Sequence, residues 1–197
     1  EVLTPLGASR RRALAVVCDL AGADDALASD ALGAPVDLDV ALAGIPMVAV
    51  GADGWREPHP LWQTVRALKL ESDDRERVRR RAIDHLVARH RYDDAMTLAQ
   101  GAGLDDVVPH VLRAACISGA RPSAGQIERW LAASPASVRS SSGGQLADAL
   151  RASLVAPNEA VDLLKSAAAR MRDEGDVDGE LVAIGNLGRL AWWSQDR

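Results

Sequence analysis

AVGADGWREPHPLWQTVRAL (residues 49–68) joins a short β pattern to a helical one. The apolar run PMVAV (46–50) ends inside this stretch, and the turn sequence GADG and then Trp55, Arg56 and Glu57 follow it. This pattern predicts a β-hairpin of two short strands. Pro58 and Pro60 then flank His59, which predicts a sharp corner where His59 orients or caps the chain. Pro60 fits the first turn of a helix that reaches about Leu70.

Three helical patterns precede this hairpin. Residues 9–21 carry an apolar stripe with Ser9 as the expected N-cap, and residues 24–32 begin at the capping residue Asp24 and end at Gly33. A third pattern covers 37–43 and ends at Gly44. The order of three helices and a hairpin is that of a winged helix, which we therefore expect over residues 1–58.

From His59 onward the sequence has helical periodicity and no strand pattern. We expect Ser72 to cap a long helix, and SPASVRSSSGG (134–144) to form a loop. Helices are expected at 72–90, 92–100, 104–116, 122–131, 145–155, 158–172 and 176–193. Because no helix is apolar on all sides, each must stack on neighbours, as in an α-solenoid. Two segments, 91–103 and 175–193, resemble tetratricopeptide helices, so the expected fold is mainly α, with a tetratricopeptide-like arm over 59–197.

Charge argues against nucleic-acid binding. The chain has 197 residues and a net charge of −5, and no Lys or Arg lies between Arg12 and Arg56. Because cations that neutralise phosphates supply most non-specific DNA affinity, this head is expected to contact protein instead. We also expect no membrane span, and cytoplasmic free thiols at Cys18 and Cys116. The chain is expected to be a piece of a longer protein.

The sequence lacks the motifs of common enzyme and metal sites. The four histidines have no paired ligand spacing, the two cysteines have no CxxC partner, and no GxSxG, GxGxxG or P-loop motif is present. Acid pairs recur at helix starts, where they stabilise the helix dipole. We expect no catalytic residue, metal or cofactor in this chain.

One basic run, RERVRRRA (75–82), allows an i, i+4 pair between Glu76 and Arg80. A solvated or interdomain helix face is the favoured interpretation, and a ligand patch is the alternative. Acidic residues outnumber basic ones in 1–58, whereas basic ones prevail in 59–100. The acidic head and the basic neck are therefore expected to dock on each other or on another module, with Arg79, Arg80 and Arg81 as interdomain residues.

The segment from SRRRALAVV to TVRALKL (9–70) resembles the winged helix of STAND ATPases, in particular the large LuxR-type and SARP-like bacterial transcriptional regulators. The residues that carry the likeness are Gly54-Trp55 and His59-Pro60-Leu61. RRRAIDHLVARHRYDDAMTLAQGAG (79–103) resembles the first arm helices of these proteins, and IERWLAASPASVRSSSGGQLADALRA (127–152) resembles a recurrent arm element.

The resemblance implies an ATPase module elsewhere in the full-length protein, and hence ATP or ADP as its nucleotide. It implies that the helical arm senses an inducer or partner protein and that Trp55 and Trp62 pack the junction between wing and arm. His59 matches a position that contacts the nucleotide phosphate in some members. The alternative is a free-standing tetratricopeptide-like scaffold with no link to an ATPase.

Overall fold

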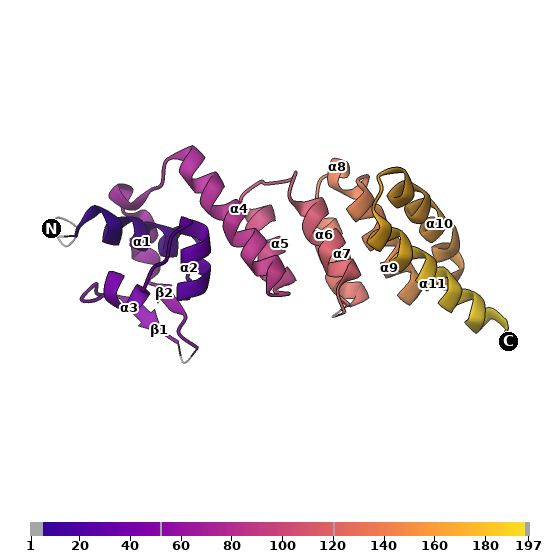
Figure 1. Ribbon diagram of the computed structural model, residues 1–197, viewed down its shortest axis with the longest axis horizontal. Helices are drawn as coiled ribbons and strands as arrows, with labels where there is room; N and C mark the ends of the chain where they lie inside the picture. The colour runs from indigo at the N-terminus through magenta and orange to yellow at the C-terminus, as the bar shows by residue number, and fades with distance from the viewer. Residues whose placement is uncertain (1–5, 52, 120, 196–197) are drawn as a thin grey trace. The chain divides into compact units, whose positions relative to one another are not determined.

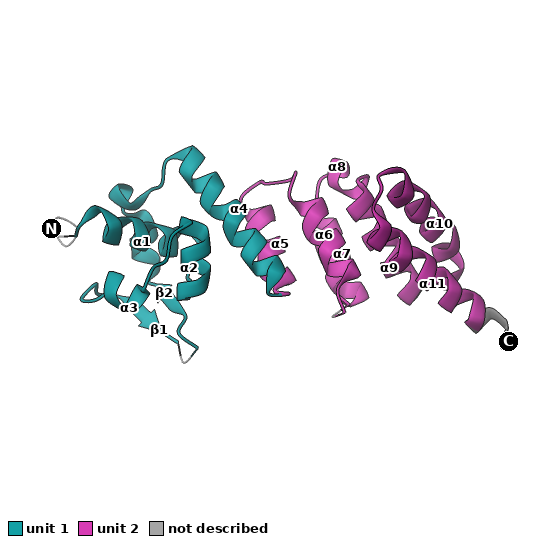
Figure 2. Ribbon diagram, in the orientation of Figure 1, with its two compact units in different colours: residues 1–89 teal, residues 90–197 magenta. Residues whose placement is uncertain are grey.

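The computed structural model describes residues 6–51, 53–119 and 121–195 (Figure 1). The described part of the chain is mainly helical and contains one small two-stranded sheet, which confirms the expectation of a mainly α protein. Packing divides the chain into two compact units, residues 1–89 and 90–197 (Figure 2).

Unit 1 packs helices against one another, with a small hairpin beside the first of them. Its buried core includes Leu14, Val17, Leu38, Val78 and Ile83. The elements are α1 Ala8–Asp19, α2 Asp25–Leu32, α3 Leu38–Ala41, β1 Val48–Val50, β2 Arg56–Pro58, the 3-10 turns η1 Pro60–Thr64 and η2 Arg66–Leu68, and α4 Ser72–Ala88.

Local signals set several helix ends of unit 1. The Asp24 carboxylate accepts the Leu27 backbone N–H at 2.7 Å, and Gly33 ends α2 with a left-handed φ of 71°. Both features confirm the sequence prediction for α2. The capping role predicted for Ser9 is wrong, because α1 begins at Ala8 after Gly7. The same holds for Ser72, since Glu71 precedes α4 in the N-cap position.

The predicted hairpin is confirmed. β1 and β2 pair antiparallel, with Val48 opposite Pro58 and Val50 opposite Arg56. On its other side, Arg56 forms an isolated antiparallel bridge with Ala23: the Ala23 N–H donates to Arg56 O at 3.1 Å and the Arg56 N–H donates to Ala23 O at 2.8 Å. β2 therefore lies between β1 and the segment that follows α1.

The helix predicted from Pro60 to Leu70 is wrong. The chain makes two short 3-10 turns there, η1 and η2, separated by Val65 in an extended conformation (φ −77°, ψ 107°). Val65 is β-branched, a side-chain type with a low helix preference and a high preference for extended backbone.

Unit 2 is a series of antiparallel helices. The predicted helices are confirmed with shifted ends; for example, the one expected from Leu104 begins at Val108, after a turn. The elements are α5 Tyr92–Gly101, α6 Val108–Ile117, α7 Ala124–Ala132, α8 Ala136–Arg139, α9 Ser142–Val155, α10 Pro157–Asp173 and α11 Val177–Gln195.

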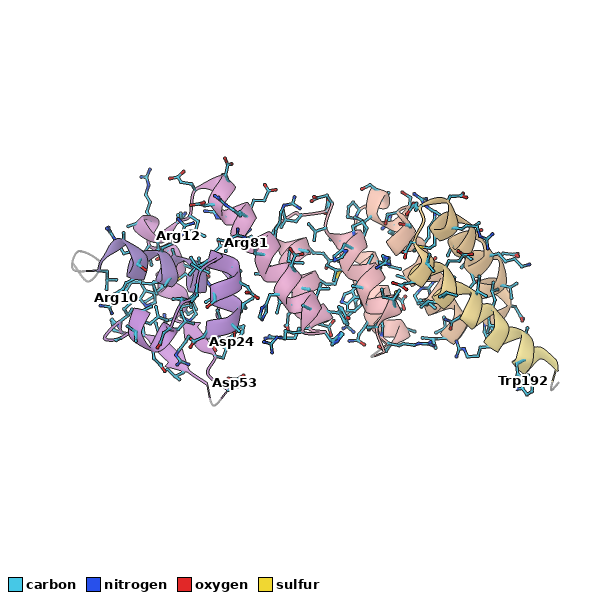
Figure 3. The ribbon with its side chains drawn as sticks, viewed as in Figure 1. Arg10, Arg12, Asp24, Asp53, Arg81 and Trp192 are labelled. Carbon is cyan, nitrogen blue, oxygen red and sulfur yellow. The ribbon has the colours of Figure 1, made fainter. Side chains whose placement is uncertain are left out.

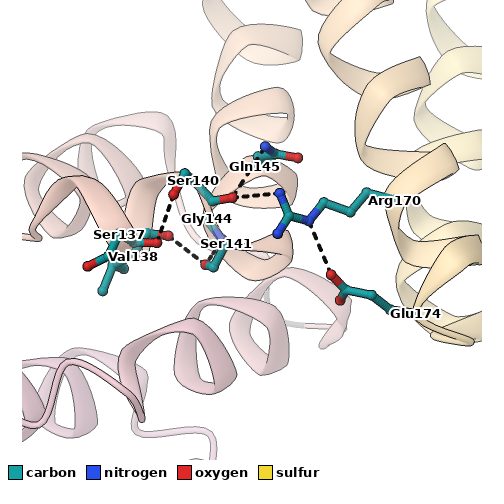
Figure 4. A network of polar contacts seen from close by, with 8 residues as sticks. All are labelled: Ser137, Val138, Ser140, Ser141, Gly144, Gln145, Arg170 and Glu174. Carbon is teal, nitrogen blue, oxygen red and sulfur yellow. Dashed lines mark hydrogen bonds and ion pairs between the residues drawn. The ribbon is translucent and has the colours of Figure 1, made fainter.

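The loop predicted at 134–144 is wrong. It contains α8 and the first turn of α9, where Ser141 Oγ caps the helix by accepting the Gly144 N–H at 3.1 Å (Figure 4). A Cβ on Gly143 would lie 2.1 Å from the backbone oxygen of Pro109 in α6, and one on Gly144 would lie 2.2 Å from that of Val138. The two glycines are therefore required for close helix approach rather than for loop flexibility.

The expected boundary at residue 58 and the packing boundary at Arg89 describe different things. α4 packs against α2, so the first compact unit includes α4. A compact unit is defined by contacts, whereas the division into 1–58 and 59–197 was inferred from the sequence pattern and resemblance. The boundary at 58 stays a prediction.

Candidate functional site

A half-buried charge cluster joins α1 to α4 inside unit 1. Arg79 Nε donates to Asp19 Oδ2 at 2.7 Å and Arg79 Nη2 donates to Asp19 Oδ1 at 3.0 Å. Arg75 Nε lies 3.3 Å from Asp19 Oδ1. The Asp19 side chain is only 13% exposed, so its charge is held by these two guanidinium groups. Arg79 thus has a structural role at the end of α1.

The other members of the basic run differ in what they contact. The predicted pair between Arg80 and Glu76 is confirmed, with Arg80 Nε donating at 2.9 Å on the surface of α4. Arg81 (Figure 3) lies against Gly33 at the C-terminal end of α2, where its guanidinium fills the space of a missing side chain. Arg79 and Arg81 therefore contact other elements of unit 1, and the role of Arg79, Arg80 and Arg81 as interdomain residues stays a prediction.

The two tryptophans of the corner both pack inside unit 1. The half-buried Trp55 ring lies against Gly22, in the turn that follows α1, so closely that no side chain fits there. Trp62 is buried, and its Nε1–H donates to the backbone oxygen of Pro46 at 3.0 Å. Both rings hold the hairpin and η1 in place, and their role at a junction of wing and arm stays a prediction.

His59 is exposed and acts as a cap, as the sequence indicated. Its Nδ1 accepts the Leu61 backbone N–H at 3.2 Å, while its own backbone N–H donates to Met47 O at 2.8 Å. Because Nδ1 is an acceptor, a neutral ring carries its proton on Nε2. That N–H is the group with which His59 would contact a phosphate, and the nucleotide contact stays a prediction.

A cavity of about 310 Å³ lies beside the charge cluster. Burial, followed by the charge of Asp19, raises the pKa of Cys18 to about 11, so this thiol stays protonated at neutral pH and is a poor nucleophile. The lining of the cavity includes Ala15, Cys18, Trp62, Leu68, Lys69 and Arg79.

A second charge cluster lies in unit 2 and was missed by sequence reasoning. Arg113 of α6 makes a two-point ion pair with Asp176, which precedes α11, and Asp176 Oδ1 also accepts the Gly179 N–H at 3.1 Å. The hydrogen bonds that Arg113 donates lower the pKa of Asp176, and the same hydrogen bonds raise the pKa of Arg113. The partners are 63 residues apart, so no local pattern indicates the pair.

A polar network next to this cluster links α8, α9 and α10 (Figure 4). Arg170 Nη1 donates to the backbone oxygen of Ser140 at 2.7 Å, and Arg170 Nε donates to Glu174 Oε1 at 3.1 Å. Hydrogen bonds from Ser142 and then Arg170 lower the pKa of Glu174. These groups satisfy one another and the ends of helices, which is a structural arrangement.

The described residues contain no cluster of three His, Cys, Asp or Glu side chains that could hold a metal ion. In the same part of the chain, no helix combines the length and apolar character needed to cross a membrane. No model of a known protein family matches the chain, and neither a curated protein nor a solved structure matches it. Its function is therefore argued from its own residues.

Proposed function

We propose that this chain is the protein-docking part of a STAND-type transcriptional regulator. In this proposal residues 1–58 are a winged helix that docks on an ATPase module of the same protein, and residues 59–197 are a tetratricopeptide-like solenoid that binds an inducer or partner protein. The chain itself is not an enzyme, and the ATP or ADP belongs to the ATPase module.

The surface charge of the head carries this proposal. Each aspartate of the cation-free interval has a structural partner, so the acid excess is built into the fold. The pairs are Asp19 with Arg79, Asp24 with Leu27 N, Asp25 with Leu38 N, Asp30 with His85, Asp37 with Val40 N, Asp39 with Arg56, and Asp53 with Trp55 N. Asp25, Asp37 and Asp53 are exposed and accept from backbone N–H groups rather than from cations, so a duplex would meet their fixed negative charge.

Two of the three arginines before α2 are engaged within the fold. Arg10 donates to the backbone oxygens of Ala41 and Ala43 at the end of α3, and Arg12 lies 3.5 Å from Asp74 (Figure 3). In addition α3 has only four residues, a single turn about 6 Å long, which is short for a helix that reads a major groove. Both features support protein docking over DNA binding.

Exposed apolar side chains on the head suit a protein partner. Val40 on α3, Met47 before β1 and Val50 at the end of β1 are 68%, 50% and 65% exposed, and Leu61 on η1 is 57% exposed. Burial of such groups drives protein association. The order α1, α2, α3, β1, β2 and the bridge from Ala23 to β2 support the winged-helix interpretation.

DNA titration tests the charge argument. A fluorescent 30-base-pair duplex is mixed with the chain, and anisotropy is followed as salt is raised. We expect no binding at 100 mM salt. Tight binding whose affinity falls steeply with salt would overturn the proposal, because it would show phosphate contacts by this chain.

The second test uses the full-length protein. Its reading frame should encode a P-loop ATPase module beside this chain, and Val40→Asp with Val50→Asp should change its nucleotide turnover. Leu163→Asp, at an exposed position of α10, is the control and should leave turnover unchanged. Absence of a P-loop module from the reading frame would contradict the proposal and favour the free-standing scaffold.

A further inference from the structure

The last helix of unit 2, α11, presents an apolar face that no other described element covers. Val177, Leu181 and Trp192 are 64%, 62% and 69% exposed, and Ile184 is 43% exposed. Figure 3 shows Trp192 projecting from the last turns of α11. At 100° per residue these positions form one stripe along the helix.

Two glycines in this stripe have no packing reason within the described chain. A Cβ on Gly185 or Gly188 would meet nothing within 4 Å, whereas one on Gly179 would meet Met171 and Asp176. A glycine inside a helix costs about 1 kcal/mol relative to alanine. Gly185 and Gly188 therefore leave two gaps on an exposed face, and such gaps allow a second helix to approach closely.

The exposed positions of α11 have a two-fold symmetric pattern. When the helix is reversed about the midpoint between residues 184 and 185, each exposed position falls on another exposed position. An antiparallel copy of α11 then places Leu181 opposite Gly188, Ile184 opposite Gly185, and Trp192 opposite Val177. Among residues 177–192, the exposed positions are 177, 178, 181, 184, 185, 188, 191 and 192.

From this pattern we propose that two copies of this chain associate through α11, packed antiparallel across a two-fold axis between residues 184 and 185. In this arrangement Leu181 and Ile184 each meet a glycine, and Trp192 meets Val177. The interface is isologous and therefore closes at two copies. It does not depend on the function proposed for the head.

The helix dipoles favour the antiparallel direction, because they oppose each other in that arrangement. A parallel pair would set Trp192 beside Trp192. No two like charges of the stripe face each other in the antiparallel arrangement.

The area of the face predicts a weak, reversible pair. The exposed parts of its large side chains amount to roughly 500 Å² per copy, and a pair would bury about 1,000 Å², the size of weak and transient interfaces. Sedimentation equilibrium over a hundredfold range of concentration should show a monomer–dimer equilibrium for residues 1–197.

Gly188→Leu separates association from folding. It fills the gap that receives Leu181 of the second copy, so the dimer should weaken by at least about tenfold. Its own helix should become more stable, because leucine is a better helix former than glycine and the space is open. Adding Leu181→Ala to Gly188→Leu should restore much of the dimer, and Leu163→Ala on α10 is the control that should leave it unchanged.

Cross-linking tests the register. Asp178→Cys and Ala191→Cys are prepared as separate variants, since positions 178 and 191 face each other only in the antiparallel pair. A disulfide between the two variants when they are mixed supports the proposal. Disulfide homodimers of Ala191→Cys alone would overturn the antiparallel direction, and a chain that stays monomeric at every concentration would overturn the proposal itself.

Discussion

Gly143→Ala should destabilise unit 2, although alanine is the better helix former. The new Cβ would lie 2.1 Å from the backbone oxygen of Pro109, and ordinary contact begins at 3.4 Å. Relieving the overlap requires α9 and α6 to separate by about 1.3 Å, since the obstacle is backbone rather than a flexible side chain. Such overpacking costs about 1–3 kcal/mol, and the gain in helix propensity offsets at most about 1 kcal/mol.

The expected net change is a loss of about 2 kcal/mol in the free energy of unfolding. Urea unfolding followed by circular dichroism measures it, and hydrogen exchange at α9 amides assigns the change to unit 2. Gly125→Ala is the matched control. Gly125 is the second residue of the serine-capped helix α7, as Gly143 is of the serine-capped helix α9, but a Cβ on Gly125 would meet open space. Gly125→Ala should therefore raise the free energy of unfolding slightly.

Equal stabilisation by both alanine variants would refute the reasoning. It would mean that α9 does not approach α6 as closely as the structure places it, and that the glycine pair is only a flexible start of a helix. A loss at Gly143 together with a gain at Gly125 can come only from the contact with Pro109, because helix position and residue change are the same.

Three further changes have expected outcomes. Asp19→Asn should lower the free energy of unfolding by about 1–2 kcal/mol in urea titration, because Arg79 loses its charged partner. The loss is limited because the Arg79 side chain is a quarter exposed and water screens its charge. An unchanged urea midpoint would contradict this prediction. Arg113 lowers the pKa of Asp176, so this carboxylate stabilises the fold above its unfolded pKa, and that stability is lost as pH falls through the lower folded pKa. Arg113→Gln should therefore move acid unfolding, followed by circular dichroism, to higher pH. An acid midpoint identical to that of the unchanged protein would count against this. Burial raises the pKa of Cys116 to about 12. Iodoacetamide at pH 8 should therefore alkylate the Cys116 thiol in urea but not in the native protein. Alkylation of Cys116 in the native protein, detected by mass spectrometry, would disprove its burial.

Features set by neighbouring residues were predictable from the sequence. The cap at Asp24, the end at Gly33 and the hairpin around GADG each depend on groups within a few residues. The helices of unit 2 other than α8 were predicted because their apolar spacing is itself the signal for burial. The capping role of His59 also follows from its position between two prolines.

Features set by distant contacts were not predictable. The glycines at 143 and 144 resemble a flexible loop until Pro109 is placed against them. The ion pair of Arg113 with Asp176 joins residues that no local rule connects. In each case the local residue type is compatible with two structures, and only tertiary packing decides between them.

The basic run of α4 shows why charge counted along a sequence overestimates the surface open to a partner. Arg79 is committed to Asp19, and Arg81 lies against Gly33. Reversal of the charge of Arg79 would set a new acid beside Asp19 and break the contact of α1 with α4, so a regulatory loss in that variant would have a structural cause. Side chains already used by the fold therefore cannot define the docking surface proposed for the head, whereas exposed apolar side chains such as Val40 and Val50 remain available for it.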